Sequence, residues 1–448
     1  MSENNGFKNT EIGIIPADWE INEIQNISQK IWIGLVTTMT SHYVENGIPL
    51  IRNNNIKPNK IFSLNMIFLD ADFSERNKHR YLHTGDIVTV HTGDIGTSTI
   101  IEPEFDPSHG FATINTSVDE TIIYNKYLCY YFNSPIFKHR IEAYATGDGR
   151  SNFNLYDYLF VKVPYPQKIH EQRKIARILS TVDAVIEKTE ASIDKYKNIK
   201  AGMMRDLFTR GIDLATGKLR TSYEEAPALY KHSELGWVPK EWETKKFNDI
   251  VKDYFDFRGR TPLKLGMNWG NGEYKAISAN NVEMGRLNFD KEFYTGGDEL
   301  YNAWMTKGDC AKGDVLMTSE APLGIIAQIS DDSQYILSQR VILFKTNSQV
   351  VLNDYLFFLM MDNQFQTKLL KNSSGSTVTG IQQARLALIK ISIPKELLEQ
   401  ERIALKLKSI STIIEAEDQN LKKVKKLKYG LMSDLLTGKV RVKYEKEK

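Results

Sequence analysis

Residues 171–209 read EQRKIARILSTVDAVIEKTEASIDKYKNIKAGMMRDLFT, and residues 399–437 read EQERIALKLKSISTIIEAEDQNLKKVKKLKYGLMSDLLT. These two stretches have the same length and matching ends, and in both the apolar residues recur three or four positions apart. That spacing predicts amphipathic α-helices. A pair of helices this long, repeated at a constant offset, predicts an architecture in which each helix follows one globular part.

The repeat extends outward from the helices in both directions. Before them, TEIGIIPADWE at 10–20 returns as SELGWVPKEWE at 233–243, and GDIV at 85–88 returns as GDVL at 313–316. After them, TGKLRTSYEE at 216–225 returns as TGKVRVKYEK at 437–446, the first copy carrying seven extra residues. The sequence therefore predicts two related halves, each with a globular part and a helix.

Each helix is predicted to carry two apolar seams, which indicates a coiled-coil partner. The predicted packing residues of the first helix are Ile175, Leu179, Val182, Ile186, Ile193, Met203 and Leu207. Those of the second helix are Ile403, Leu407, Ile410, Ile414, Leu421, Leu431 and Leu435. The alternative is that each helix packs only on its own globular part.

The order of the parts predicts the direction of the helices. If each globular part packs at the start of the helix that follows it, the end of the first helix lies beside the start of the second. The helices then run antiparallel, related by an approximate two-fold axis. At about 1.5 Å per residue, each would be roughly 57 Å long.

The predicted fold class is α+β, with two globular recognition domains separated by an antiparallel coiled coil. Short β-branched and aromatic runs between turn residues predict many short strands in the globular parts. The expected divisions are a first domain at 1–167, a first helix and linker at 168–225, a second domain at 226–397, and a second helix with a basic tail at 398–448.

Composition narrows the class of protein. The chain has 448 residues and a formal net charge of +2, with no apolar run long enough to span a membrane. Its two cysteines, Cys129 and Cys310, are too few for a disulfide framework or a zinc site, which favours a cytoplasmic location. The run from Lys422 to Lys428 is locally basic. Contacts to DNA phosphates and a solvated helical face explain this run equally well.

The sequence offers no catalytic site and no metal site. It contains no phosphate loop, no dinucleotide fingerprint, no HExxH and no Asn-Pro-Pro-aromatic segment of the kind used by amino-methyltransferases. His79, His83 and His91 match no ligand spacing and are interpreted as surface residues. We therefore expect a chain that performs no chemistry and binds no cofactor.

Polar clusters in both globular parts are suited to reading DNA, because such side chains can bond base edges and phosphates. In the first domain these are Arg52, Asn53, Asn54, Lys57, Arg150, Ser151 and Asn152. In the second they are Arg258, Arg260, Lys264, Ser278, Asn280, Asn281, Ser376, Thr377, Thr379, Gln382 and Gln383. For any one of these residues, a polar turn or a helix cap is the simpler explanation.

The whole pattern resembles the specificity subunit of type I restriction–modification enzymes. The resemblance is carried by the two helices and by the openings GIIPADWE and GWVPKEWE, and it covers nearly the whole chain. It implies two target recognition domains, each reading one half of a bipartite double-stranded DNA site. It also implies docking of two modification subunits, which methylate adenine N6, and of two restriction subunits. S-adenosylmethionine, ATP and Mg²⁺ would then be bound by those partner subunits.

Two other classes of protein remain open from the sequence. A coiled-coil scaffold that does not bind DNA would have the same long helices. An autonomous DNA methyltransferase would also bind DNA. Because the two globular parts follow one plan but differ in most residues, a DNA-reading chain is expected to recognise a non-palindromic site. A few unread base pairs would separate its halves, since readers on one face of the duplex favour spacings of about one helical turn.

Overall fold

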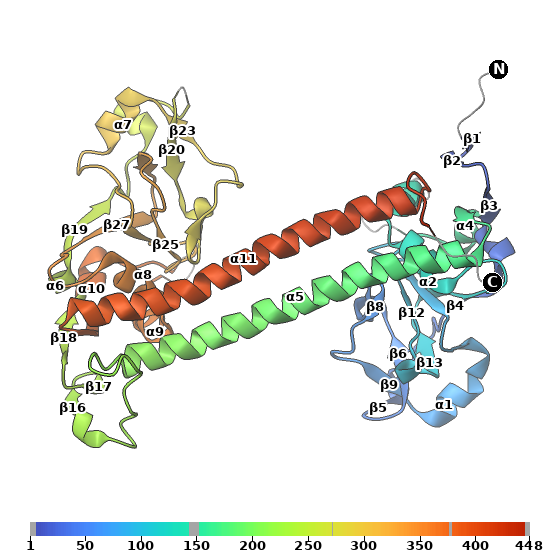
Figure 1. Cartoon of the computed structure of the whole chain (residues 1–448), viewed down its shortest axis with the longest axis horizontal. Helices are drawn as coiled ribbons and strands as arrows, with labels where there is room; N and C mark the ends of the chain where they lie inside the picture. The colour runs from blue at the N-terminus through green and yellow to red at the C-terminus, as the bar shows by residue number, and fades with distance from the viewer. Residues whose placement is uncertain (1–5, 143–151, 271, 376–378, 444–448) are drawn as a thin grey trace. The chain divides into compact units, whose positions relative to one another are not determined.

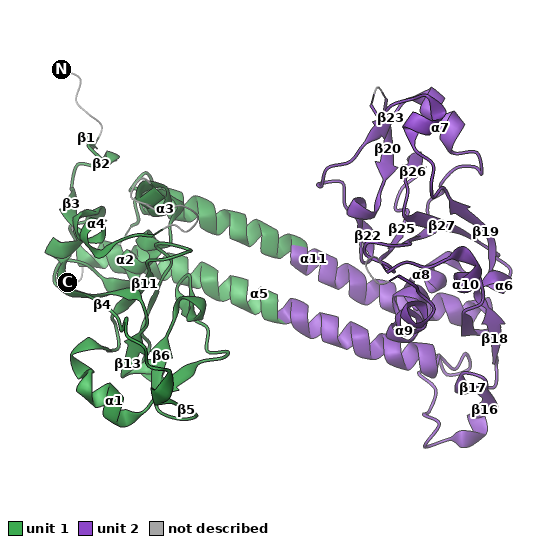
Figure 2. Ribbon diagram, turned by 180° about the vertical axis from the view of Figure 1, so that it is seen from behind, with its two compact units in different colours: residues 1–191, 419–448 green, residues 192–418 purple. Residues whose placement is uncertain are grey.

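The computed structural model describes residues 6–142, 152–270, 272–375 and 379–443. The chain forms two compact units, 1–191 with 419–448 and 192–418 (Figure 2). The α+β fold class with two long helices is confirmed: α5 spans Ile169–Thr209 and α11 spans Leu397–Leu435 (Figure 1). The domain limits predicted from the sequence stay predictions. No helix in the described residues is both long and apolar enough to cross a membrane.

The first unit contains two larger sheets. A four-stranded antiparallel sheet has the order β12-β11-β14-β4, and a five-stranded sheet has the order β10-β13-β6-β9-β5, in which β13 and β6 are parallel. The strands of the first sheet are β4 (Ser28–Ile33), β11 (Ile87–Val90), β12 (Ser98–Ile100) and β14 (Thr113–Val118). Those of the second are β5 (Tyr43–Val44), β6 (Ile48–Ile51), β9 (Ile67–Leu69), β10 (Tyr81–Leu82) and β13 (Ser108–Gly110).

The second unit repeats this plan. Its four-stranded sheet has the order β19-β27-β24-β25, and its three-stranded sheet has the order β23-β20-β26, in which β20 and β26 are parallel. The strands are β19 (Val251–Asp256), β24 (Val315–Thr318), β25 (Ile326–Gln328), β27 (Val341–Thr346), β20 (Tyr274–Ile277), β23 (Thr295–Gly296) and β26 (Tyr335–Leu337). The sequence repeat is therefore a structural repeat.

Smaller elements complete each unit. In the first they are the hairpin β1 (Phe7–Thr10) and β2 (Gly13–Pro16), the pair β3 (Trp19–Glu23) and β15 (Lys162–Pro166), the pair β7 (Ile56–Lys57) and β8 (Lys60–Ile61), α1 (Ala71–Arg76), α2 (Asn125–Phe132), α3 (Pro135–Glu142) and α4 (Leu155–Phe160). In the second they are the hairpin β16 (Tyr230–Ser233) and β17 (Gly236–Pro239), the pair β18 (Trp242–Lys246) and β28 (Lys390–Pro394), the pair β21 (Val282–Glu283) and β22 (Arg286–Leu287), α6 (Phe247–Ile250), α7 (Asp298–Trp304), α8 (Asn353–Met361), α9 (Asn363–Lys371) and α10 (Gln383–Ala387).

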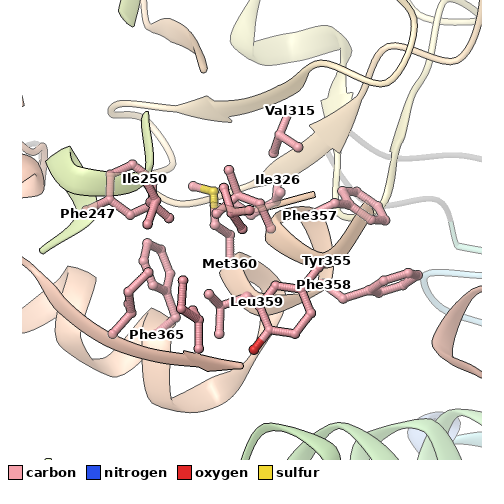
Figure 3. Packing of buried hydrophobic residues seen from close by; sticks show 14 of the residues in the cluster. Phe247, Ile250, Val315, Ile326, Tyr355, Phe357, Phe358, Leu359, Met360 and Phe365 are labelled. Carbon is pink, nitrogen blue, oxygen red and sulfur yellow. The ribbon is translucent and has the colours of Figure 1, made fainter. Parts of the chain in front are cut away.

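A helix that is apolar on all sides lies in the core of each unit. The segment YLFFLM of α8 is buried throughout, and so is YLCYYF of α2. Such sequences cannot be solvated on any face, so they form helices only where packing covers them completely. Figure 3 shows α8 side chains among residues from the sheet and from α6, including Phe247, Val315 and Ile326.

The Glu-Gln pair that opens each long helix anchors it to the globular part before it. In the first unit the Gln172 amide donates to the carbonyls of Ile122 and Pro166, and its oxygen accepts the Tyr124 N–H. In the second unit Gln400 makes the same set of bonds, to Val350, Pro394 and Leu352. Both glutamines are fully buried, so these bonds replace water for every polar atom of the side chain.

The glutamate of the same pair binds an arginine that follows the other long helix. Glu171, which opens α5, is bound by Arg441 through Nε and Nη2, at 2.8 and 2.9 Å. Glu399, which opens α11, is likewise bound by two nitrogens of one arginine, Nη1 and Nη2 of Arg220. Each unit therefore contains the start of one long helix and the chain that leaves the end of the other.

The two helices run antiparallel within each unit. In the first, Asp183 pairs with Lys428 at 2.6 Å and Glu190 pairs with Lys425 at 2.7 Å, so rising positions on α5 meet falling positions on α11. In the second, Met204, Leu207 and Phe208 share one core cluster with Ile403 and Leu407. The basic run of α11 is thus partly used in ion pairs with α5.

The predicted seam residues all lie at least partly in the interior. Among the packing residues predicted from the sequence, Ile175, Leu179, Ile193, Leu207, Ile403, Leu407, Ile410, Ile414 and Leu435 are buried and the others are half-buried. The seams also include Met204, Phe208 and Met432, which are buried although the heptad pattern did not select them.

Candidate nucleic-acid interface

An open groove of about 680 Å³ lies on the second unit. Residues 278–280 of a 3₁₀ turn and residues 282–284 at β21 line one part of it; Ala321, Pro322 and Ile325 of the β24–β25 loop line another. Ser338–Arg340, between β26 and β27, and Lys291 complete the lining. Hydroxyl, amide, guanidinium, ammonium and carboxylate groups therefore face one space, which is the combination that base edges and phosphates require.

The 3₁₀ turn at the groove has a twin in the first unit. Asn281 is fully buried, and its Oδ1 accepts the Ser278 hydroxyl and N–H at 2.7 and 3.3 Å. Asn55 is equally buried and accepts the Arg52 N–H at 3.2 Å. In both turns the preceding asparagine, Asn54 or Asn280, is exposed. One asparagine thus holds the turn while its neighbour is presented to solvent.

Three segments converge beside the turn of the first unit. The Asn53 amide donates to the Thr92 carbonyl at 3.2 Å, which joins the turn to the β11–β12 loop. The Asn152 oxygen lies 3.1 Å from His91 Nδ1 and accepts the Thr92 hydroxyl at 3.3 Å, which adds the segment before α4. The predicted residues Asn53, Asn54 and Asn152 are therefore brought to one place.

The second unit brings its segments together in the same way. The Ile381 N–H donates to the Ser319 carbonyl at 3.1 Å, as the Phe153 N–H donates to that of His91 in the first unit at 2.8 Å. Arg258 Nη1 donates to the Ile381 carbonyl at 2.8 Å. The β24–β25 loop, the segment before α10 and the chain after β19 therefore meet near the groove.

Several predicted DNA-binding residues are occupied within the chain. Arg52 donates to the Asn65 carbonyl at 2.7 Å, and Arg258 donates to the Asp256 carboxylate through Nε and Nη2. Arg260 donates to the Trp304 carbonyl and lies over the Phe257 ring. These guanidinium groups hold loops in place, so their availability to DNA is reduced.

Other predicted residues have exposed side chains, some of which also hydrogen-bond within their unit, as Asn280 does to the Glu292 carbonyl at 3.3 Å. Those with exposed side chains are Asn54, Lys57, Asn152, Lys264, Asn280, Thr379 and Gln382, and Gln383 is half-buried. Lys264 also donates to the Gly259 carbonyl at 2.6 Å. Arg150, Ser151, Ser376 and Thr377 lie outside the described residues.

The groove contains charged residues that sequence reasoning missed. Arg340 pairs through Nε with Glu320 at 3.0 Å, and Lys291 pairs with Glu283 at 3.0 Å. Hydrogen bonds from Asn288, Arg286 and Lys291 lower the pKa of Glu283 to about 2, so this carboxylate is ionised throughout the neutral range. No motif marks these residues, because they come from separate segments that only the fold joins.

The described residues contain no candidate metal centre, and their cysteines are buried. No group of three His, Cys, Asp or Glu side chains among them is placed to hold a metal ion. Both cysteines are buried, and burial raises their thiol pKa values, that of Cys310 to about 12. A thiol in that state is a poor nucleophile. The arrangement is suited to binding through hydrogen bonds and charge.

Comparison with known proteins places these features in context. The family model described as the type I restriction modification DNA specificity domain matches twice, at residues 16–196 and 239–426. The protein of Methanocaldococcus jannaschii assigned as the type I restriction enzyme MjaX specificity subunit is 29% identical, over 98% of this chain and 97% of its own length. The MjaVIII specificity subunit of that organism is 30% identical, over 68% of each chain.

Solved structures show the same fold at low sequence identity. The S subunit of the type I restriction–modification system from M. genitalium aligns with a TM-score of 0.58 and 13% identity, over 97% of this chain and 98% of its own. A chain from a study of complex assembly and conformational transition in a type I system aligns with a TM-score of 0.53 and 13% identity, over 95% and 99% of the two chains.

Proposed function

The chain belongs to the family of type I restriction–modification specificity subunits, and on this premise we propose that it reads a bipartite, non-palindromic DNA site for partner enzymes. In this proposal each unit reads one half-site. The chain directs adenine-N6 methylation, and restriction where restriction subunits are present, but it catalyses neither reaction.

The proposal rests on one observation: three chain segments meet at a surface in each unit, and the side chains at that surface differ between the two units. In both units a 3₁₀ turn presents an exposed asparagine, Asn54 or Asn280, beside a loop of the four-stranded sheet. The groups at this surface differ: His91, Thr92 and Asn152 in the first unit, and Lys291 and the Glu320-paired Arg340 in the second. The two units therefore have the same backbone arrangement but different hydrogen-bonding groups, which supports the proposal that they read two different short sequences.

The proposal also assigns the chemistry to other subunits. Two modification subunits would supply S-adenosylmethionine and the methyl transfer, and two restriction subunits would supply ATP hydrolysis, Mg²⁺ and cleavage. The family of the chain supports this division of labour.

Methylation-aware sequencing of a host genome with and without the gene tests the proposal. We expect one interrupted motif to lose N6-methyladenine when the gene is removed, with one modified adenine in each half on opposite strands. A continuous palindrome or a single uninterrupted half-site would contradict the two-reader proposal. Methylation by the purified chain alone, with labelled methyl donor and DNA, would contradict its non-catalytic role.

A further inference from the structure

Arg340 and Glu320 form an ion pair at the groove of the second unit. Arg340 is the residue directly before β27, and its backbone has a φ of +69°. Its carbonyl accepts the Ser319 N–H at 2.8 Å, which ties it to the loop that carries Glu320. The two side chains are 54% and 36% exposed. An ion pair this open to water contributes little to stability, so the fold does not explain it.

The guanidinium of Arg340 keeps hydrogen-bonding capacity that Arg258 has lost. Arg258 donates to the Asp256 carboxylate through Nε and Nη2 and to the Ile381 carbonyl through Nη1. For Arg340, only Nε is engaged among the described contacts, by Glu320 at 3.0 Å. Its two terminal amino groups are left for a ligand in the groove. A carboxylate on Nε fixes the plane of the fork that these groups form.

The first unit has the same backbone frame without the charged pair. Ala112, with a φ of +50°, directly precedes β14 as Arg340 directly precedes β27. Thr92 bridges Asn152 as Glu320 bridges Gly380. Thr92 and Ala112 therefore occupy the places of Glu320 and Arg340. Because the frame forms with these small residues, the charged pair is an addition specific to the second unit.

We infer that Arg340 reads a guanine in the second half-site and that Glu320 positions its guanidinium fork. This inference rests on the proposed function and names a specificity residue within it. The two terminal amino groups would donate to the guanine O6 and N7, the acceptor pair that an arginine fork matches in the major groove. The Glu320 carboxylate would also weaken binding to DNA of unrelated sequence, because it repels the negatively charged phosphates.

The test uses the full chain in complex with its modification subunits and a library randomised over both half-sites. For Arg340→Ala, we expect preference at one or two adjacent base pairs of the second half-site to fall about tenfold or more, with the first half-site unchanged. For Arg340→Lys, we expect the same loss of preference, because the charge remains but the fork does not. For Glu320→Gln, we expect tighter binding to unrelated DNA.

The control is Lys312→Ala, which removes an exposed positive charge at the opposite end of β24 and is expected to leave both half-sites unchanged. If Arg340→Ala weakens all sequences equally while Arg340→Lys matches the wild type, Arg340 is a phosphate contact and the inference is overturned. A wild-type chain without preference at the second half-site would instead refute the proposed function. An unchanged preference in Arg340→Ala would refute this inference alone.

Discussion

The Arg220 guanidinium and the Glu399 carboxylate face each other through two parallel contacts in the interior of the second unit. The Nη2–Oε2 distance is 2.8 Å, and the side chains are only 7% and 1% exposed. The carboxylate also accepts the Ile212 N–H at 2.9 Å and the Trp242 indole N–H at 3.0 Å. One glutamate thus joins the start of α11, the chain after α5 and the strand β18.

Removal of Arg220 is predicted to destabilise the second unit strongly. The change Arg220→Ala leaves Glu399 as a buried charge without its partner, and breaking a buried pair in this way costs about 3–5 kcal/mol. Urea unfolding followed by tryptophan fluorescence should show a lower midpoint. Arg205→Ala, which removes a side chain that is 76% exposed, is the control. Equal midpoints for the two variants would show that the pair does not hold the unit.

The packing of the long helices predicts a contrast between two leucines. Leu207 of α5 is 4% exposed in the core cluster that contains Ile403 and Leu407, whereas Leu405 of α11 is 56% exposed. Leu207→Ala should lower the free energy of unfolding by about 2–5 kcal/mol, because it leaves a cavity. Leu405→Ala should change it by about 0.5 kcal/mol or less. Denaturant titration of both variants measures the difference, and similar losses would contradict the burial described here.

The twin 3₁₀ turns predict a division of labour between neighbouring asparagines. Asn54→Ala should alter preference only in the half-site of the first unit, and Asn280→Ala only in that of the second, by about 1–3 kcal/mol per lost base contact. Asn281→Ala should instead destabilise its turn, because the Ser278 groups lose a buried acceptor. Profiling each variant on a randomised site library distinguishes the two effects. Unchanged specificity in both exposed variants would exclude these residues as readers.

Because Glu283 is ion-paired, we expect the stability of the second unit to depend on pH at acidic values. Hydrogen bonds from Asn288, Arg286 and Lys291 lower its pKa from 4.5 to about 2. A lowered carboxyl pKa gives stabilisation that is full above the unfolded value and is lost as the pH falls through the folded value. The stability difference between wild type and Glu283→Gln should therefore stay constant above about pH 5 and shrink between about pH 4.5 and 2.

Thermal unfolding across that pH range checks the prediction for Glu283. The variant Glu401→Gln, on the exposed face of α11, controls for the loss of any surface carboxylate. A difference that grows as the solution becomes more acidic would contradict the lowered pKa.

The long helices could be predicted from the sequence because their burial is periodic along the chain. Residues such as Ile175, Leu179, Ile403 and Leu407 repeat at helical spacing, and all four are buried. The pattern failed to select Met204, which lies one position beyond the chosen Met203. A seven-residue repeat drifts on a helix of 3.6 residues per turn, so a straight seam shifts to the neighbouring position.

The candidate interface could be predicted only in part. Residue type alone does not distinguish a side chain that contacts DNA bases from one that holds a loop in place. Asn280 and Asn281 are adjacent in the sequence, yet one is exposed and the other fully buried. Arg258 and Arg340 are both arginines of one unit, yet the first donates to a backbone carbonyl and the second faces the groove. These differences depend on contacts between segments far apart in sequence, which no local pattern records.

The bond between Glu171 and Arg441 has a consequence for synthesis, because it joins residues 270 positions apart. A ribosome that adds about 5–20 residues per second needs roughly 15–50 s to pass from one to the other. The second unit, a continuous stretch from 192 to 418, is completed sooner. The globular part that is translated first therefore finishes folding last. Until Met432 and Leu435 emerge, the core that they cover stays open to chaperones and to other nascent chains.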